Sequence, residues 1–549
     1  MRKIKKWAVG ILVTVVVAVS VGFQSDFFEI AKQIDIYTTL FKELNMYYID
    51  EVNPAKLTNK SINHMLSSLD PYTYYYDEQG VEDARIASTG EYGGIGAISQ
   101  YKDNILTIRE VLVNSPAQKS GIKVGDKVIK IEDIVVKDYG DKSITALLNG
   151  LPDTKVKLQL ERQNKIFDIE ITRQKIHINP VPYFTMLDAE VGYISFTKFN
   201  EKAASSIKNA FLELKEQGMK KLIIDVRSNP GGLLNEAVKI SNFFLPKDKV
   251  VVTTKAKTEK WSDTFKTRSE PLDLEIPISI LVNNRSASAS EILAGSLQDY
   301  DRAVIIGERS FGKGLVQRYR TLTYGTQMKL TISKYYTPSG RCIQELDYTN
   351  RDEKGNIPKF SDVERKAFST EKGRTVYGGG GIQPDIEIKK PTTTETTKIL
   401  LNSDAFFNYA TSYFYTHKSI VAASDFKLRN SDFSSLVNYL KNHHNYFETK
   451  TEAEFNKAKQ KAATENLDGN LSKSYASLLE DIRDEKLKEL EKNKQEILEK
   501  LTEEIVKRYY FNEGMYQQKT VFDTTILKAV SVLNNSNEYN GTLSTGENH

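Results

Sequence analysis

Three serines and one lysine occupy positions in the sequence that suit acyl-transfer chemistry. Ser286, Ser288 and Ser290 follow an apolar run at 278–282, which predicts a buried strand, and they open a segment with helical periodicity. Free backbone N–H groups and the helix dipole stabilise negative charge at such a junction, where an acyl-transfer nucleophile needs donors for its oxyanion. Lys313 lies between two glycines after a second apolar strand, so burial there would lower its pKa toward that of a general base. This pattern predicts a serine hydrolase with a lysine base.

Two other interpretations of these loops fit the sequence less well. A Ser–His–Asp triad needs a histidine, but of the six histidines only His177 is near the region that holds the serines. The segment 307–313 matches a phosphate-binding loop, yet Gly314 stands where Ser or Thr would hold magnesium, and a strand pattern follows instead of a helix. We therefore expect neither a histidine triad nor nucleotide binding.

A second loop, at 225–232, reads Asp-Val-Arg-Ser-Asn-Pro-Gly-Gly between a buried strand pattern and a helix pattern. Its tandem glycines, Gly231 and Gly232, let the backbone approach a ligand closely and present an N–H. From about 191 to 390 strands alternate with helices, which predicts a layered α/β domain that positions both loops. The expected elements are strands at Val191–Phe196, Lys221–Val226, Val250–Thr254, Ile276–Val282, Ala303–Ile306 and Met328–Tyr336, and a helix at Ala203–Glu216.

Residues 91–176 form a separate pattern of short strands and turns that resembles a PDZ domain of bacterial proteases. The resemblance rests on a glycine loop at 93–98 and on the segment SPAQKSGIKVGDKVIKIE at 115–132. It implies that backbone N–H groups of the loop hold the C-terminal carboxylate of a peptide, which is added as an extra strand. A PDZ fold with only a structural role is the alternative. The residues implied in carboxylate binding are Gly94, Ile95, Gly96 and Ala97.

The N-terminus and the composition constrain location and partners. Four basic residues precede an apolar segment at 7–23, so residues 1–25 are expected to be a signal peptide or an uncleaved membrane anchor, between which the sequence does not decide. The catalytic part is therefore expected outside the cytoplasm, in the periplasm or cell envelope. A net charge of +4, with 27% charged residues, argues against a nucleic-acid binder. The single cysteine, Cys342, excludes an intramolecular disulfide and a cysteine-based zinc site.

The remaining segments complete the expected domain organisation. Residues 26–90 are expected to be helical, 177–390 to form the α/β core, 391–397 a linker, 398–535 a helical extension and 536–549 a disordered tail. The extension offers no candidate chemistry, and its apolar stripe breaks near Lys494, which argues against a sustained coiled coil. We expect it to bind an adaptor or to mediate self-association.

Taken together, the motifs are similar to those of the carboxy-terminal processing (tail-specific) peptidases. They occur in that family's order as LDPYTYYY, the PDZ domain, DVRSNPGG, SASASEILAGSLQDYDRAVIIGERSFGKGLVQ and GGGGIQPDIEI, over residues 27 to about 390. The resemblance implies a multidomain α/β protein with a crotonase-like core, in which Ser288 is the nucleophile, Lys313 the general base and Gln317 the residue that orients the lysine. Ala289 would supply one half of the oxyanion hole, and one of the two tandem glycines the other. No metal, nucleotide or other cofactor is implied.

The expected function is that of an exported serine endopeptidase that selects protein substrates by their C-terminal residues through the PDZ domain. The alternative is a PDZ-based peptide-binding scaffold or chaperone whose peptidase site is closed or inactive. Ser286 and Ser290 are expected to cap or pack at the helix start, and Asp299 to have a structural role at an exposed helix end.

Overall fold

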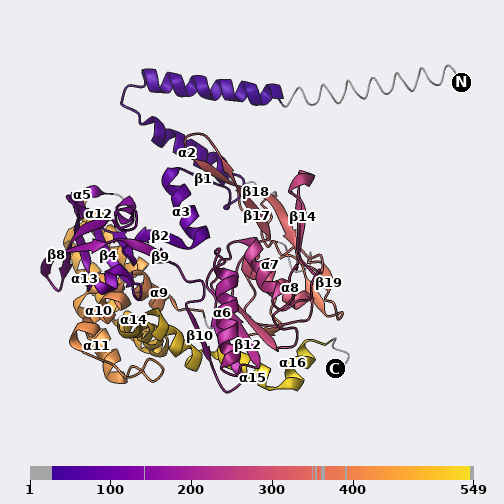
Figure 1. Cartoon of the computed structure of the whole chain (residues 1–549). Helices are drawn as coiled ribbons and strands as arrows, with labels where there is room; N and C mark the ends of the chain where they lie inside the picture. The colour runs from indigo at the N-terminus through magenta and orange to yellow at the C-terminus, as the bar shows by residue number, and fades with distance from the viewer. Residues whose placement is uncertain are drawn as a thin grey trace, which may run out of the picture. The chain divides into compact units, whose positions relative to one another are not determined.

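The structure, a computed structural model, describes residues 27–140, 142–348, 350–352, 355–359, 365–389 and 392–544 (Figure 1). It separates into two compact units, Met1–Asp77 with Tyr319–Leu330 and Glu78–Arg318 with Thr331–His549. The expected signal or anchor at residues 1–25 lies outside the described residues. None of the described helices is long and apolar enough to cross a membrane.

The first unit contains helices and a short strand pairing. A helix covers residues 27–47, and α2 (Pro54–Ser67) begins after Asn53, whose side chain accepts a hydrogen bond from Lys56 N at 2.9 Å. β1 (Tyr74–Tyr76) pairs antiparallel with residues 327–329 of β18 (Gln327–Tyr336).

The centre of the second unit is a six-stranded sheet. Its strands in spatial order are β10 (Tyr183–Met186), β11 (Val191–Ser195), β12 (Lys221–Asp225), β15 (Ile278–Val282), β16 (Val304–Gly307) and β21 (Ile386–Glu387). The strands from β11 to β21 pair in parallel, and β10 pairs antiparallel at one edge. Every residue of β11 and β15 is buried, as happens when helices cover both faces of a parallel sheet. The predicted layered α/β core is confirmed.

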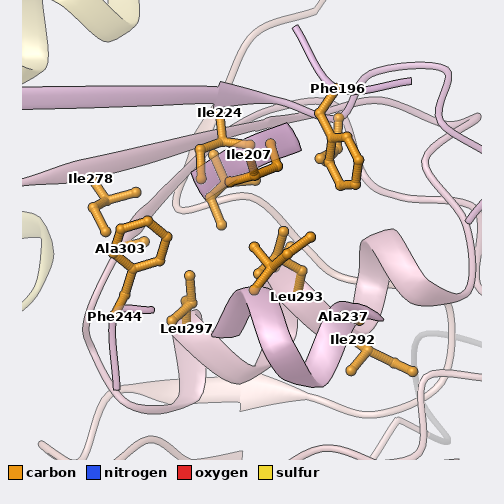
Figure 2. Packing of buried hydrophobic residues seen from close by; sticks show 14 of the residues in the cluster. Phe196, Ile207, Ile224, Ala237, Phe244, Ile278, Ile292, Leu293, Leu297 and Ala303 are labelled. Atoms are coloured by element: carbon orange, nitrogen blue, oxygen red, sulfur yellow. The ribbon is translucent and has the colours of Figure 1, made fainter. Parts of the chain in front are cut away.

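Helices from distant parts of the sequence cover the two faces of this sheet. One face packs against α6 (Ala203–Glu216), α7 (Leu234–Asn242) and α8 (Ala289–Asp299); Figure 2 shows Ile207 of α6 and Leu293 of α8 near Ile224 of β12. The other face packs against α15 (Thr524–Asn534) and α16 (Ser536–Thr542), which are yellow in Figure 1. Ile223 lies in this second cluster, because neighbouring residues of a strand point to opposite faces.

The C-terminal tail differs from the expectation of disorder from residue 536. Residues 536–542 form α16, which is anchored by the buried side chain of Tyr539. The hydroxyl group of Tyr539 accepts a hydrogen bond from Ile278 N at 2.9 Å, at the start of β15. The polar composition of the segment suggested disorder, but a few apolar residues are sufficient to dock it on the sheet.

The PDZ region is inserted before the central sheet. Its sheet has the order β3 (Ala97–Lys102), β4 (Ile105–Val111), β5 (Lys127–Ile131), β7 (Lys155–Arg162) and β8 (Lys165–Thr172), with β6 (Ile134–Val135) beside β5. Its helical elements are α4 (Pro116–Lys119), α5 (Val136–Tyr139) and the 3-10 helix η1 (Lys142–Leu148). The entering strand β2 (Glu91–Gly94), after α3 (Glu78–Thr89), pairs with the leaving strand β9 (Gln174–His177), so the insertion begins and ends at one place.

The chain beyond residue 394 is helical. Its helices are α9 (Glu395–Asn402), α10 (Ala405–Thr416), α11 (Asn430–Asn442), η3 (His444–Phe447), α12 (Lys450–Thr464), α13 (Asp468–Lys492) and α14 (Lys494–Phe522), followed by α15 and α16. The expected linker at 391–397 already contains the start of α9, because Thr394 caps this helix and Glu496 accepts a hydrogen bond from Thr397 Oγ1 at 2.9 Å. Asn493 separates α13 from α14 close to the predicted break at Lys494.

The remaining strands form two further sheets. They are β13 (Val250–Ala256), β14 (Asp263–Lys266), β17 (Leu315–Thr321), β19 (Ala367–Ser369) and β20 (Thr375–Tyr377), with the 3-10 helix η2 (Glu259–Trp261). β13 pairs antiparallel with residues 333–336 of β18, and β17 pairs with β18. This arrangement places Tyr335 and Gln317 on adjoining strands.

Candidate active site

Ser288 lies at the junction of β15 and α8, immediately before the first residue of the helix. Its backbone has φ 56° and ψ −113°, which a non-glycine residue rarely adopts. Such strain persists only where the surrounding contacts hold it, and it is concentrated at functional sites. Two contacts hold it here: Tyr335 Oη donates to Ser288 O at 3.2 Å, and Ser288 N donates to Glu291 Oε2 at 2.7 Å. The turn therefore presents a half-buried serine at a helix N-terminus.

Glu291 connects the serine to the turn that carries the lysine. Its Oε2 accepts from Ser288 N and from Lys313 N at 3.0 Å, and its Oε1 accepts from Ser310 Oγ at 2.6 Å and Gly312 N at 2.7 Å. Complete burial raises the pKa of Glu291 to about 7, and these four hydrogen bonds oppose the rise. One buried carboxylate thus fixes the two loops relative to each other.

Lys313 and Gln317 follow in the turn and strand after β16. Lys313 is half-buried, and its backbone N–H shares an acceptor oxygen with Ser288 N. Gln317 lies on β17, where its Nε2 donates to Thr331 Oγ1 of β18 at 3.2 Å. This hydrogen bond fixes the orientation of the amide group. The structure thus brings the backbones of Ser288 and Lys313 to one point and places Gln317 on the strand that follows.

Residues 226–232, which we call the NPGG loop, lie against the serine segment. The hydroxyl group of Ser286 donates to Val226 O at 2.8 Å, and that of Ser290 donates to Asn229 O at 3.0 Å. Both serines are fully buried, and both bonds cross between the loops. The two serines that flank Ser288 therefore pack and connect the loops, which is one of the two roles expected for them.

The two glycines of the NPGG loop have different surroundings. A Cβ atom on Gly231, whose φ is 92°, would lie 2.9 Å from both Ala289 N and the Cβ of Ser288, so only glycine fits there. The N–H of Gly231 donates to Asn229 Oδ1 at 2.9 Å. Gly232, with φ 147°, lies against the backbone of Phe199. Ala289 is the first residue of α8, where backbone N–H groups point out of the helix.

Arg227 of the NPGG loop contacts the C-terminal helices. Its guanidinium group is bound by Asp225 at 2.6 Å and by both oxygens of Asp523, at 2.8 and 2.9 Å. Burial disfavours the charged form of Arg227, but the two carboxylates outweigh that effect and raise its pKa well above the usual value. The extension, for which the sequence suggested no chemistry, thus supplies a residue next to the candidate site.

Asp299 differs from its expected exposure. Its side chain is buried at the end of α8 and forms an ion pair with Arg341 at 2.7 Å, and both side chains are at most 1% exposed. Asp299 Oδ2 also accepts from Ser339 N at 2.9 Å. The structural role is retained, but its physical basis is a buried ion pair, which sequence spacing does not show.

The PDZ region presents an open sheet edge. β3 pairs with β4 on one side, and the sheet order ends with β3 on the other. The loop before it contains Ile95, which is buried, and Gly96, whose φ is 75° and whose added Cβ would lie 2.3 Å from the Cβ of Ser115. Gly94 and Ala97 flank these two residues at the ends of β2 and β3. Among the described strands, none pairs with the outer edge of β3, and the glycine turn lies next to this edge.

In the part of the chain that the structure describes, no group of three or more His, Cys, Asp and Glu residues is arranged to hold a metal ion.

The contacts of Glu291 and of the pair Arg227–Asp523 were not predicted from the sequence. The sequence did contain a pattern that could have predicted the contact of Glu291 with Ser288 N, because an acidic residue three positions after a helix-capping serine is typical of a capping box. Arg227 and Asp523 are 296 positions apart, and each alone is an ordinary loop residue. Only the docking of α15 on the sheet brings them together.

Comparison with protein-family models gives three matches. Residues 93–172 match a PDZ domain, residues 190–351 match peptidase family S41, and residues 396–533 match the C-terminal helical domain of probable PDZ-proteases. These matches confirm the expected architecture of a peptidase core with an inserted PDZ domain and a helical C-terminal domain.

Two curated relatives and two solved structures are similar to parts of the chain. The chain is 36% identical over 309 residues to a "Probable CtpA-like serine protease" of Staphylococcus aureus (strain MRSA252), which covers 55% of this chain and 61% of that protein. A protein of the same description from Staphylococcus haemolyticus (strain JCSC1435) is 36% identical over 308 residues, with the same coverage. The chain thus spans 61% of the length of these relatives.

Of the solved structures, the photosystem II D1 C-terminal processing protease is 26% identical, with a TM-score of 0.35, and the match covers 64% of this chain and 92% of that one. The PDZ domain of a carboxy-terminal protease from Vibrio cholerae, in complex with peptide, is 28% identical with a TM-score of 0.15, and covers 16% of this chain and 98% of that one.

Proposed function

Because the chain belongs to the C-terminal processing peptidases of peptidase family S41, we propose that it is a serine endopeptidase with Ser288 as nucleophile and Lys313 as general base. The observation that carries the proposal is the Glu291 carboxylate, which accepts from Ser288 N and Lys313 N with the same oxygen. A strained serine at a helix N-terminus and a lysine on a glycine turn are thereby held together.

The proposed reaction is two successive acyl transfers. Ser288 Oγ gives its proton to the neutral amine of Lys313 and forms a bond to the scissile carbonyl carbon. The tetrahedral intermediate then breaks its C–N bond, and the leaving amine takes the proton from Lys313. Water, deprotonated by Lys313, hydrolyses the resulting ester and regenerates Ser288. Gln317 would accept a hydrogen bond from Lys313 Nζ through Oε1, because its Nε2 is already bound to Thr331.

Two backbone N–H groups are proposed to stabilise the oxyanion. Ala289 N, at the start of α8, is the first. Gly232 N is the better candidate for the second, because the N–H of Gly231 already donates to Asn229 Oδ1. Gly231 instead serves the close approach of the NPGG loop to Ser288, since any side chain there would collide with the serine segment.

Protein substrates are proposed to bind first through their C-termini. The glycine loop Gly94–Ala97 would hold the terminal carboxylate with backbone N–H groups, and the peptide would extend the sheet at the free edge of β3. Charge-assisted hydrogen bonds contribute about 1.5–3 kcal/mol each. A fluorescent peptide with a free C-terminus should therefore bind about tenfold or more tightly than its C-terminal amide. Equal affinities would refute the carboxylate site and leave the peptidase proposal intact.

The catalytic assignment is tested with purified full-length variants and an unfolded protein substrate with an apolar C-terminus. We expect Ser288→Ala and Lys313→Ala each to abolish cleavage, and a fluorophosphonate or sulfonyl fluoride to label the wild type but not Ser288→Ala. Ser205→Ala and Lys220→Ala change exposed side chains that bind Lys202 and Glu190 rather than residues of the site, and both variants should retain activity. Turnover in either active-site variant would exclude the dyad. Peptide binding without any wild-type turnover or labelling would favour the scaffold alternative.

An extracytoplasmic location is proposed from the basic and apolar N-terminal residues. In cell fractionation, a full-length reporter fusion should leave the cytoplasm, whereas a fusion that lacks residues 1–25 should remain there. The same fractionation distinguishes a cleaved signal from an anchor, because an anchored chain stays in the membrane fraction and keeps its full mass. Retention of the full-length fusion in the cytoplasm would contradict the proposal.

A further inference from the structure

We propose that the C-terminal helical extension holds the NPGG loop in its working conformation, with Asp523 as the positioning residue. The inference rests on the proposed function, because it concerns the oxyanion donors of the same site. It assigns a role in catalysis to a part of the chain beyond the segment that matches peptidase family S41.

The contact is direct and buried. Arg227 is the second residue of the NPGG loop, and its Nη1 donates to both oxygens of Asp523, at 2.8 and 2.9 Å. The side chains of Arg227 and Asp523 are 9% and 10% exposed. Such a two-oxygen contact fixes the direction of the guanidinium group as well as its distance. The backbone of Arg227 is also tied to Asp225, whose Oδ1 accepts from Arg227 N at 3.0 Å.

Asp523 is itself fixed on a rigid platform. It lies between α14 and α15 and caps α15, because its Oδ1 accepts from Thr525 N at 2.9 Å and from Ile526 N at 3.2 Å. Ile526, Ala529 and Val532 are fully buried against the central sheet. The carboxylate of Asp523 is thus held by the core that carries the candidate site.

The NPGG loop needs such external contacts. Ser228, Gly231 and Gly232 all have positive φ, at 60°, 92° and 147°, and a strained backbone keeps its shape only where its surroundings define it. Asn283 holds one point, since its Oδ1 accepts from Ser228 N at 2.8 Å. Asp523 holds Arg227, the residue that precedes Ser228. Loss of Asp523 would leave Arg227 paired with Asp225, so the fold survives while the loop gains freedom.

The test compares two contacts at opposite ends of α15 in the full-length protein. Asp523→Asn removes the charge but keeps a side chain that caps helices well. Asn534→Ala is the matched control: it removes bonds from Asn534 to Lys221 (2.8 Å) and Asp188 (3.0 Å), which also join the extension to the core but lie outside the NPGG loop. Steady-state cleavage, the rate of Ser288 labelling and thermal unfolding are measured for each.

For Asp523→Asn we expect kcat and the labelling rate to fall about 10- to 100-fold, somewhat less than the loss on deleting an oxyanion-hole donor. KM should stay near the wild-type value, because substrate selection takes place at the PDZ groove. Asn534→Ala should keep both rates. If Asp523→Asn does not fold, Asp523→Ser, which also caps helices, replaces it. A kcat within about twofold of wild type, or an equal loss in Asn534→Ala, would overturn the inference. An inactive wild type would instead refute the proposed function itself.

Discussion

Replacement of Glu291 by glutamine tests how the loops that carry Ser288 and Lys313 are held together. The carboxylate accepts four hydrogen bonds, two at each oxygen, and every donor is at 2.6–3.0 Å. Glutamine keeps one acceptor oxygen and replaces the other by an NH2 donor. The less unfavourable orientation of the introduced amide places its NH2 group at the position of Glu291 Oε1, next to Ser310, because the Ser310 hydroxyl can rotate and accept a hydrogen bond. In that orientation Gly312 N loses its acceptor and faces the NH2 group, which is also a donor.

The expected loss of stability follows from this single unpaired group. A buried donor without an acceptor costs about 1–3 kcal/mol, so Glu291→Gln should lower the free energy of unfolding by this amount. Small domains have about 5–15 kcal/mol in total, so the variant is expected to fold. Displacement of the turn around Gly312 also moves Lys313. Misplacement of a catalytic group by about 1 Å can cost about a hundredfold in rate, so we expect kcat to fall about 10- to 100-fold.

The assay measures kcat and urea unfolding at about pH 8, where Glu291 is ionised in the wild type. Glu236→Gln is the matched control, because Glu236 is also a buried carboxylate of the core. It accepts from Ala204 N at 2.9 Å and from Lys239 Nζ at 2.6 Å, and neither donor belongs to the candidate site. The control should lose stability but keep kcat. A kcat for Glu291→Gln within about twofold of wild type would refute the role of Glu291.

Three further predictions concern pH, backbone space and a buried ion pair. Burial raises the pKa of Glu291 from 4.5 to about 7, so kcat should fall as the pH drops below about 7, and the stability advantage of wild type over Glu291→Gln should shrink as the pH rises from about 5 to about 8. An acid whose pKa is higher in the folded than in the unfolded protein stabilises the fold at pH values below its unfolded pKa, and this stabilisation is lost as the pH rises through its folded pKa. A stability difference between the two proteins that does not change with pH in urea unfolding would contradict the prediction. Gly231→Ala should reduce the rate of Ser288 labelling about tenfold or more, because its Cβ would lie 2.9 Å from that of Ser288, and unchanged labelling would exclude the close approach. Asp299→Asn should lower the free energy of unfolding by about 3–5 kcal/mol, since it leaves the buried charge of Arg341 without its ion-pair partner and with only the Gln298 amide oxygen as acceptor, and a midpoint equal to wild type would exclude this ion pair.

Residues whose role is set by local pattern were predictable from the sequence. Four strands of the central sheet, β11, β12, β15 and β16, lie where apolar runs predicted them, and α6 begins and ends at the predicted residues. Ser288 was placed at a strand-to-helix junction because a polar break follows an apolar run there, and the structure has it at that point. These features depend on neighbours within one element or turn.

Features that depend on distant contacts were not predictable in the same way. The polar sequence after residue 535 suggested disorder, but residues 536–542 form α16, which the buried side chain of Tyr539 anchors to the start of β15. Asp299 is a helix-end acid by sequence, and only the fold shows that Arg341 reaches it. The contact of Arg227 with Asp523 likewise requires α15 to be docked. In each case the deciding interaction is tertiary, and a single sequence carries no direct record of it.

The covering of the central sheet by α15 and α16 has a consequence for biosynthesis. Tyr539 binds the backbone of Ile278, 261 positions earlier, and Ile223 is buried under helices made about 300 residues later. Chains emerge from the ribosome at about 5–20 residues per second and fold from the N-terminus. The sheet therefore emerges with one apolar face uncovered, and it stays uncovered until residues 524–542 have been made. A chain that ends before α15 is therefore expected to leave the apolar residues of this face, among them Ile223, exposed to solvent.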